Sequence, residues 1–187
     1  MAVGWPDIYL QHFTRFFGKP FDVETYRQDD GTSVRLATFD PERPGRIYAS
    51  VGLSEHVGAL KDLGEVILLA DDKGKDIPEL FLNALFFILQ KRIPLGSHFA
   101  IAGVDMLKPD FADYADKHAL YFSFVLPSTN KPGFDHITRD DTGTVFQALF
   151  ISRDEHDFLK RFGWQDFEDR LHAQSGNLIS IKRPSCV

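Results

Sequence analysis

The chain has 187 residues, 43% hydrophobic and 26% charged, values that are typical of a globular protein with one domain. Its formal net charge is −6 and it contains no run of lysine or arginine, which disfavours direct binding to nucleic acid. Phenylalanine is unusually frequent, at 18 residues, and we expect so much apolar ring area to lie in a core or an interface.

The chain shows no sign of export or of membrane insertion. Its first residues lack a basic segment followed by an apolar stretch, so we expect no secretory signal peptide. The longest apolar stretch, Leu80–Leu89, is too short to span a bilayer. The single cysteine, Cys186, excludes an internal disulfide. These features predict a cytoplasmic protein.

The first part of the chain predicts one helix followed by strands. Apolar residues recur at helical spacing over Trp5–Phe17, and Gly18 ends this helix. Alternating apolar and polar residues predict a strand over Ser33–Phe39, with Arg46–Val51 as its hairpin partner. The short apolar run Gly64–Ala70 is typical of a central strand.

A second helix is predicted over Asp76–Arg92, with Asp76 as its N-cap. Glu79, Asn83 and Gln90 form one narrow polar stripe on this helix, and nearly every other position is apolar. A helix on one face of a sheet needs only one apolar stripe, so this helix must be covered on two sides. We favour burial within the chain, and an interface in a homo-oligomer is the alternative.

The second half predicts further strands and a closing pair of helices. Strands are expected within Pro94–Val104 and over Ala119–Leu126, Gly143–Ile151 and Leu178–Ile181, and Asp105–Lys117 is expected to be an exposed loop or short helix. Ser152 and Glu155 form a capping-box pattern that starts one helix, and Gln165–Ala173 predicts another. This order of elements predicts an α+β fold in a single domain spanning residues 1–187, with a mixed, mostly antiparallel sheet packed with helices.

No catalytic or metal-binding motif is present. Gly52-Leu53-Ser54-Glu55-His56 lacks the second glycine of a nucleophile elbow, and we interpret Ser54 as a helix cap. The run Asp154–Asp157 is expected to be a solvated helix start, because adjacent helical residues point about 100° apart and cannot share an ion. Cys186 is expected to be inert. The sequence therefore predicts no enzyme, no catalytic residue, no metal and no cofactor; a small hydrolase with an unreadable site is the alternative.

Several segments resemble one known family, the suppressor-of-fused-like (SUFU) domain. Ile47-Tyr48-Ala49-Ser50-Val51-Gly52-Leu53-Ser54, followed by Glu65-Val66-Ile67-Leu68-Leu69, resembles its "YaTvGlS … Elvl" block. Similar to further family elements are Pro94-Leu95-Gly96-Ser97-His98, Ala148-Leu149-Phe150-Ile151 leading into Arg153-Asp154-Glu155, and the terminal Arg183-Pro184-Ser185. The resemblance spans about Arg46–Val187, and Leu149-Phe150-Ile151 departs from it by replacing the family's "vPi".

This resemblance implies a non-enzymatic protein-binding domain. Animal members grip a peptide of a transcription factor, whereas compact bacterial-type members resemble immunity proteins that neutralise a cognate toxin, often a nuclease, inside the producing cell. For a chain of this length we expect the immunity role, with a protein partner, no nucleic acid and no membrane. Acidic loops would steer a basic toxin, so the expected contact residues are Asp110, Asp113, Asp116, Asp140 and Asp141. Ordinary solvated loops and capture of a peptide strand at a sheet edge are the alternatives.

Overall fold

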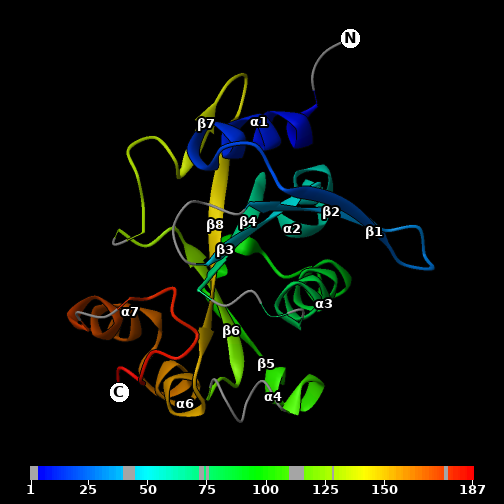
Figure 1. Ribbon diagram of the computed structural model, residues 1–187. Helices are drawn as coiled ribbons and strands as arrows, with labels where there is room; N and C mark the ends of the chain where they lie inside the picture. Colours follow the sequence, from blue (N-terminus) through cyan, green and yellow to red (C-terminus); the bar gives the residue numbers. More distant parts are fainter. Residues whose placement is uncertain are drawn as a thin grey trace.

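The computed structural model describes residues 4–39, 45–71, 74, 76–109, 116–127, 129–174 and 177–187. Within these residues, seven strands form one sheet in the order β1-β2-β3-β4-β8-β6-β5, and the short β7 also pairs with β8 (Figure 1). The strands are β1 (Asp22–Arg27), β2 (Ser33–Phe39), β3 (Arg46–Val51), β4 (Gly64–Ala70), β5 (Phe99–Ala102), β6 (Ala119–Phe124), β7 (His136–Thr138) and β8 (Thr142–Ile151). The pairing of β4 with β8 is parallel, and the others are antiparallel. The predicted α+β class and the mostly antiparallel sheet are confirmed.

Helices cover both faces of the sheet. They are α1 (Trp5–Phe17), α2 (Val57–Leu60), α3 (Asp76–Lys91), α4 (Val104–Leu107), α6 (Arg153–Phe162) and α7 (Trp164–Ala173), with 3-10 turns η1 (Leu53–His56) and η2 (Leu95–Ser97). In Figure 1, α3 lies on one side of the sheet and α7 on the other, with α1 above them. The side chains of β8 alternate accordingly, since Phe146 and Phe150 join the core under α3 while Leu149 joins the core under α7.

The predicted burial of the α3 helix within the chain is confirmed for most of its apolar residues. Leu80, Phe81, Leu85 and Ile88 are buried between the sheet and its neighbours. The polar stripe of this helix is exposed as expected, but Phe87 is 40% exposed beside it. Asp76 is the first residue of α3 and not its N-cap.

The turn between β3 and β4 is organised by the carboxylate of Glu65, which is fully buried. This carboxylate accepts hydrogen bonds from Ser50 Oγ (2.6 Å), Gly52 N–H (2.7 Å), Leu53 N–H (3.1 Å), and Ser54 N–H (3.0 Å) and Oγ (2.7 Å). Burial raises the pKa of Glu65, and the hydrogen bonds oppose that shift. The expected capping role of Ser54 is therefore wrong, because its hydroxyl is oriented by Glu65.

Replacing this carboxylate tests its role in stability. We expect Glu65→Gln to lower the free energy of unfolding by about 2–3 kcal/mol, because an amide NH₂ group would face N–H and O–H donors in a buried site. Urea denaturation followed by circular dichroism measures the change. The control is Glu55→Gln on the exposed side of the same turn, which should leave the midpoint unchanged. An equal, small effect of both substitutions would contradict the role given to Glu65.

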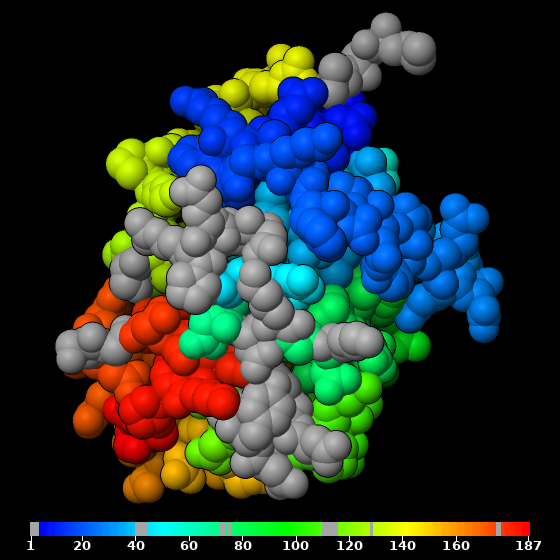
Figure 2. Space-filling view, in the orientation of Figure 1, coloured from blue at the N-terminus to red at the C-terminus, as the bar shows by residue number. Residues whose placement is uncertain are grey.

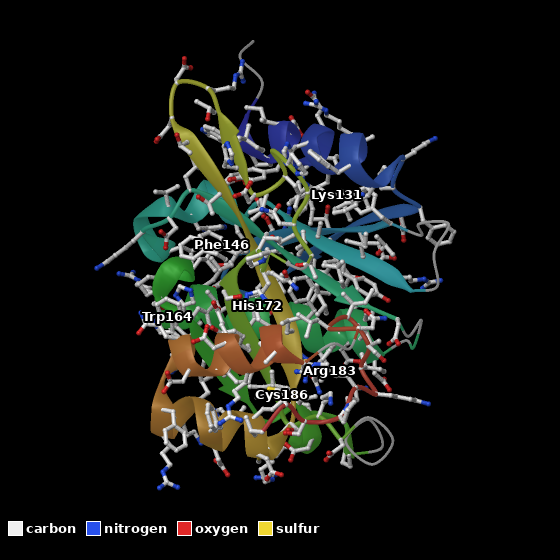
Figure 3. All side chains as sticks on the ribbon, turned by 90° about the vertical axis from the view of Figure 1, so that its left-hand side faces the viewer. Lys131, Phe146, Trp164, His172, Arg183 and Cys186 are labelled. Carbon is white, nitrogen blue, oxygen red and sulfur yellow. The ribbon has the colours of Figure 1, made fainter. Side chains whose placement is uncertain are left out.

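The C-terminal tail is fixed to the body through a second buried carboxylate. The predicted capping box at Ser152 is confirmed. The expectation of a solvated start to α6 holds for Asp154 and Asp157, which are exposed, but is wrong for Glu155, which is fully buried, and for His156, which is only 6% exposed. Glu155 pairs with the two terminal guanidinium nitrogens of Arg183, Nη1 and Nη2, and accepts from Cys186 N–H at 3.1 Å. Arg183 and Cys186 lie near each other beside α6 and α7 in Figure 3.

The predicted strand over Leu178–Ile181 is also wrong, because this segment forms turns. Its apolar residues are buried all the same, Leu178 at 7% and Ile181 at 2% exposure, which accounts for the apolar pattern in the sequence. Asp71 holds the segment by accepting from Ile181 N–H at 2.9 Å and by donating its own N–H to Ile179 O at 3.2 Å. In Figure 2 the end of the chain lies across the molecular surface.

The buried pair of Glu155 and Arg183 gives a second prediction. Each of Glu155→Leu and Arg183→Met should lower the free energy of unfolding by about 3–5 kcal/mol, because each leaves an uncompensated buried charge. The double variant should lose clearly less than the sum of the two, since it buries no charge. Urea denaturation of the wild type and the three variants measures the coupling. Additive losses would show that the pair does not act as a unit.

Candidate functional site

The free edge of the sheet at β5 is the candidate site. In the described part of the chain, β5 pairs with β6 on one side only. Gly103 N–H donates to His118 O at 3.0 Å, continuing the β5–β6 ladder. Because backbone groups in an antiparallel ladder alternate in direction, those of Ala100 and Ala102 point to the open edge. The strand sequence Phe-Ala-Ile-Ala contains no charged residue.

An apolar groove between α3 and α4 lies beside this edge, on one face of the sheet. A pocket of about 410 Å³ is lined by Phe87 of α3, by Met106 and Leu107 of α4, and by Ile101 of β5. Phe87 is 40%, Met106 83% and Leu107 59% exposed, so large apolar side chains face water here. Exposed apolar side chains that gather in one place mark binding surfaces more often than scattered ones do.

On the other face of the sheet, α6 and α7 lie beside the same edge. Ala100 packs against the core cluster beneath these helices, as Phe158 of α6 does. His98, which directly precedes β5, stacks on Trp164 with a ring separation of 4.0 Å and an interplanar angle of 16°. Its φ of 50° is unusual for a residue other than glycine, and such backbone strain is typical of functional sites. Trp164 is 39% exposed at the start of α7 (Figure 3).

Charged groups hold α4 in its place beside the groove. Lys108 bridges Asp76 (3.1 Å) and Glu79 (3.0 Å), and these hydrogen bonds raise the pKa of Lys108. The carboxylate of Asp105 accepts from His118 Nδ1 at 2.9 Å and from Arg153. Partial burial works to raise the pKa of Asp105, but the hydrogen bond and charge of His118 and the charge of Arg153 outweigh it and lower that pKa. The exposed apolar residues of α4 are therefore positioned by its polar ones.

The structure does not bring the predicted acidic contact residues together. Asp110 and Asp113 lie outside the described residues. Asp140 and Asp141 are exposed in the turn that leads into β8, and Asp116 is exposed just before β6, near the other end of β8. A strand of ten residues is about 30 Å long, so these groups belong to separate surfaces. None of the three lines the β5 groove.

The described residues offer little for chemistry. They contain no group of three or more histidine, cysteine, aspartate or glutamate residues that could hold a metal ion. Burial raises the pKa of Cys186 to about 12, and the charge of Glu155 adds to this effect, which keeps the thiol protonated. The hydroxyl of Ser54 is engaged by Glu65. Within the same residues, no helix is long and apolar enough to cross a membrane.

Sequence reasoning missed the groove, although a signal for it was present. The apolar pattern around α3 was correctly interpreted as burial. The pattern alone could not show that Phe87 is left partly exposed to solvent. The adjacent residues Met106 and Leu107 lie in Asp105–Lys117, the segment that was predicted to be an exposed loop or short helix. Two large apolar residues in such a segment, directly after a strand, are the feature that could have indicated a binding surface.

Solved structures of known proteins share this architecture. A protein described as a SUFU (suppressor of fused protein) homologue from Neisseria gonorrhoeae FA 1090 superposes with a TM-score of 0.73 and 14% sequence identity, over 98% of this chain and 97% of its own. A chain of the Sufu–Fu complex gives a TM-score of 0.63 and 13% identity, over 96% and 91%. No protein-family model and no curated protein sequence matches the chain. These likenesses confirm the SUFU-like fold that the motifs predicted.

Proposed function

We propose that this protein is a non-enzymatic binding domain that captures an extended peptide segment of another protein along the free edge of β5. The observation that carries the proposal is an uncharged edge strand with open backbone groups and an apolar groove beside it. One structural neighbour belongs to a complex between two proteins, Sufu and Fu, which supports a binding role.

The groove on one side of β5 and the α6–α7 layer on the other suit the addition of a peptide strand. A peptide strand that pairs with β5 would form backbone hydrogen bonds with Ala100 and Ala102, which provide affinity for any sequence. Its side chains would point alternately to the two faces of the sheet. One set would enter the groove at Phe87 and Met106, and the other would meet the α6–α7 layer near Trp164. The ligand is therefore a segment with apolar residues at every second position.

Selection from a random library tests this proposal. Phage-displayed 16-residue peptides are enriched on the purified full chain, and the enriched peptides are synthesised for affinity measurement by fluorescence anisotropy. We expect enriched peptides to carry apolar residues at alternate positions. Ala102→Pro and Phe87→Ala should each weaken binding about tenfold, the first by removing a backbone donor and the second by removing apolar contact.

Matched controls separate the edge from the rest of the surface. Ala102→Ser keeps the backbone N–H, and Phe21→Ala removes a ring that is 71% exposed beside the opposite edge of the sheet. Both controls should bind as the wild type does. Peptides that bind equally well to Ala102→Pro and Phe87→Ala would place the site elsewhere, and failure to enrich any peptide would count against peptide capture.

We infer further that the protein partner is a cognate toxin of basic character, such as a nuclease, which this chain neutralises inside the producing cell. The formal net charge of −6 supports this inference, because opposite charge accelerates the encounter of two proteins. The acidic residues Asp116, Asp140 and Asp141 would contribute to this long-range attraction, together with Asp110 and Asp113. Asp116, Asp140 and Asp141 lie away from the groove, so their effect would be on association rate and not on the bound contact.

A pull-down from the lysate of the native host tests the nature of the partner. We expect one stoichiometric, basic protein to co-purify with the wild type and to be lost with Ala102→Pro. Charge reversal at Asp140 and Asp141 should slow association at low salt and leave dissociation unchanged, as measured by surface plasmon resonance. A captured protein that is acidic, or that has no toxic effect when expressed alone, would contradict the toxin inference while leaving peptide capture intact.

A further inference from the structure

We propose that Trp164 and Glu168 form a binding site for an arginine side chain of the protein partner, which would contact the indole ring and the carboxylate together. The two residues are four positions apart on α7, so their side chains are neighbours on one face of the helix. The site itself does not depend on peptide capture at β5, but its place in the partner's segment rests on the proposed function.

The indole ring of Trp164 is held in one orientation and is partly open to water. The ring of His98 stacks on it, with ring centroids 4.0 Å apart, and His98 packs edge-on against Phe124 at 5.2 Å. The side chain of His98 is only 9% exposed, whereas Trp164 is 39% exposed. The exposed part of Trp164 is therefore a fixed surface, and a ligand that contacts it does not have to order the ring first.

Trp164 also has no basic side chain of this chain over its ring, in contrast to its neighbours. Two phenylalanine rings on the same pair of helices each have an arginine beside them: Arg161 over Phe162 at 5.0 Å, and Arg170 over Phe158 at 5.6 Å. Among the described residues, no lysine or arginine lies over Trp164. Tryptophan binds cations more strongly than phenylalanine does, so the better ring of the two helices is the one left without a cation.

The carboxylate of Glu168 likewise forms no ion pair with a lysine or arginine among the described residues. Its Oε1 atom accepts from Tyr121 Oη at 2.7 Å and lies 3.9 Å from His98 Nε2, which is charged only when the ring is protonated. Burial raises the pKa of Tyr121, and the hydrogen bond and charge of Glu168 raise it further, so Tyr121 stays a donor.

The second oxygen of this carboxylate is available to a ligand. No described residue donates to Glu168 Oε2, and 17% of the side chain is exposed. A carboxylate can accept several hydrogen bonds, and a charge that is mostly buried is stabilised when a cation pairs with it. A basic ligand would therefore satisfy Glu168 while it covers Trp164.

Arginine fits this pair of groups better than other side chains do. Its planar guanidinium group stacks on aromatic rings, and its N–H groups donate to carboxylates at the same time. The surrounding charges also favour a cation, because Asp166 and Asp169 are exposed on α7 and its one arginine, Arg170, lies over Phe158. An acidic side chain would be repelled here.

The site lies at the start of the β5 edge. His98 directly precedes β5 and contacts both members of the site. Ala100 of β5 is paired with Tyr121 of β6, the residue that donates to Glu168, and both belong to the core on this face of the sheet. A strand that pairs with β5 would therefore pass the site beside His98, and we expect the arginine at that end of the captured segment.

An NMR titration of the isotope-labelled full chain tests the site without any peptide. The probe is N-acetyl-arginine amide, and the matched control is N-acetyl-citrulline amide, which has the same length and no charge. The chain has two tryptophan residues, so the indole N–H of Trp5 serves as an internal reference for that of Trp164. We expect the arginine probe to give a saturable shift of the Trp164 signal at concentrations up to about 50 mM, and the citrulline probe to give none.

Substitutions on α7 complete the test. Glu168→Gln keeps an oxygen that can accept from Tyr121 but removes the charge, and it should weaken binding of the arginine probe about fivefold. Asp169→Asn removes an equal charge from an exposed position on the same helix and should bind as the wild type does. Trp164→Leu should abolish the response, read from the backbone amides of the first turn of α7, and this variant keeps the test decisive if Glu168→Gln does not fold.

Equal shifts with both probes, no shift at Trp164, or an unchanged affinity in Glu168→Gln would each overturn the site. Its link to the partner has a separate test, because peptides enriched on the full chain should carry arginine at one end of the apolar segment and should lose affinity with Glu168→Gln. Enriched peptides without such an arginine would overturn that link. Binding of the arginine probe with no enrichment of peptides would support the site while it contradicts peptide capture at β5.

Discussion

The carboxylate of Glu65 fixes the point at which the sheet changes from antiparallel to parallel pairing. Its strand, β4, pairs antiparallel with β3 and parallel with β8, and Glu65 binds the turn that leaves β3. A buried carboxylate is stable only where donors surround it, so the backbone of that turn can take only one path. The next residue back, Gly64, has no room for a side chain because the ring of Phe146 on β8 lies against it. Together these contacts set the register of β4 and β8, on which β6 and β5 are then built.

The two edge strands of this sheet differ in charge. β1 carries Asp22, Glu24 and Arg27, and charges along an exposed edge discourage pairing with other chains. β5 carries no charge, yet it too has an open edge, which is a liability unless a partner covers it. Its flanking aromatic side chains at Phe87 and Trp164 provide contacts for such a partner. This difference favours β5 over β1 as the edge that binds a peptide.

Local patterns in the sequence predicted the elements well, but not what covers them. Apolar periodicity and capping chemistry placed α1, α3 and α6, because these signals lie within a few residues of one another. Leu178–Ile181 was misassigned because buried residues in a turn and buried residues in a strand can give the same apolar pattern. Ser54 was misassigned because its partner, Glu65, is a tertiary contact across the turn. The groove needs β5, α3 and α4 to meet in space, and no local pattern reports such a meeting.

The elements on the two sides of the β5 edge differ in stability. On one side, α6 is bound to the C-terminal tail by the buried ion pair of Glu155 and Arg183, and disruption of this pair would leave a buried charge. On the other side, α4 is one short helix, and polar contacts of His118 and Lys108 hold it in place. Elements that move on ligand binding come from the less stable parts of a fold. A stable α6–α7 layer on one side of β5 and a less stable α4 on the other allow the edge strand to keep a fixed position while α4 adjusts to a bound peptide.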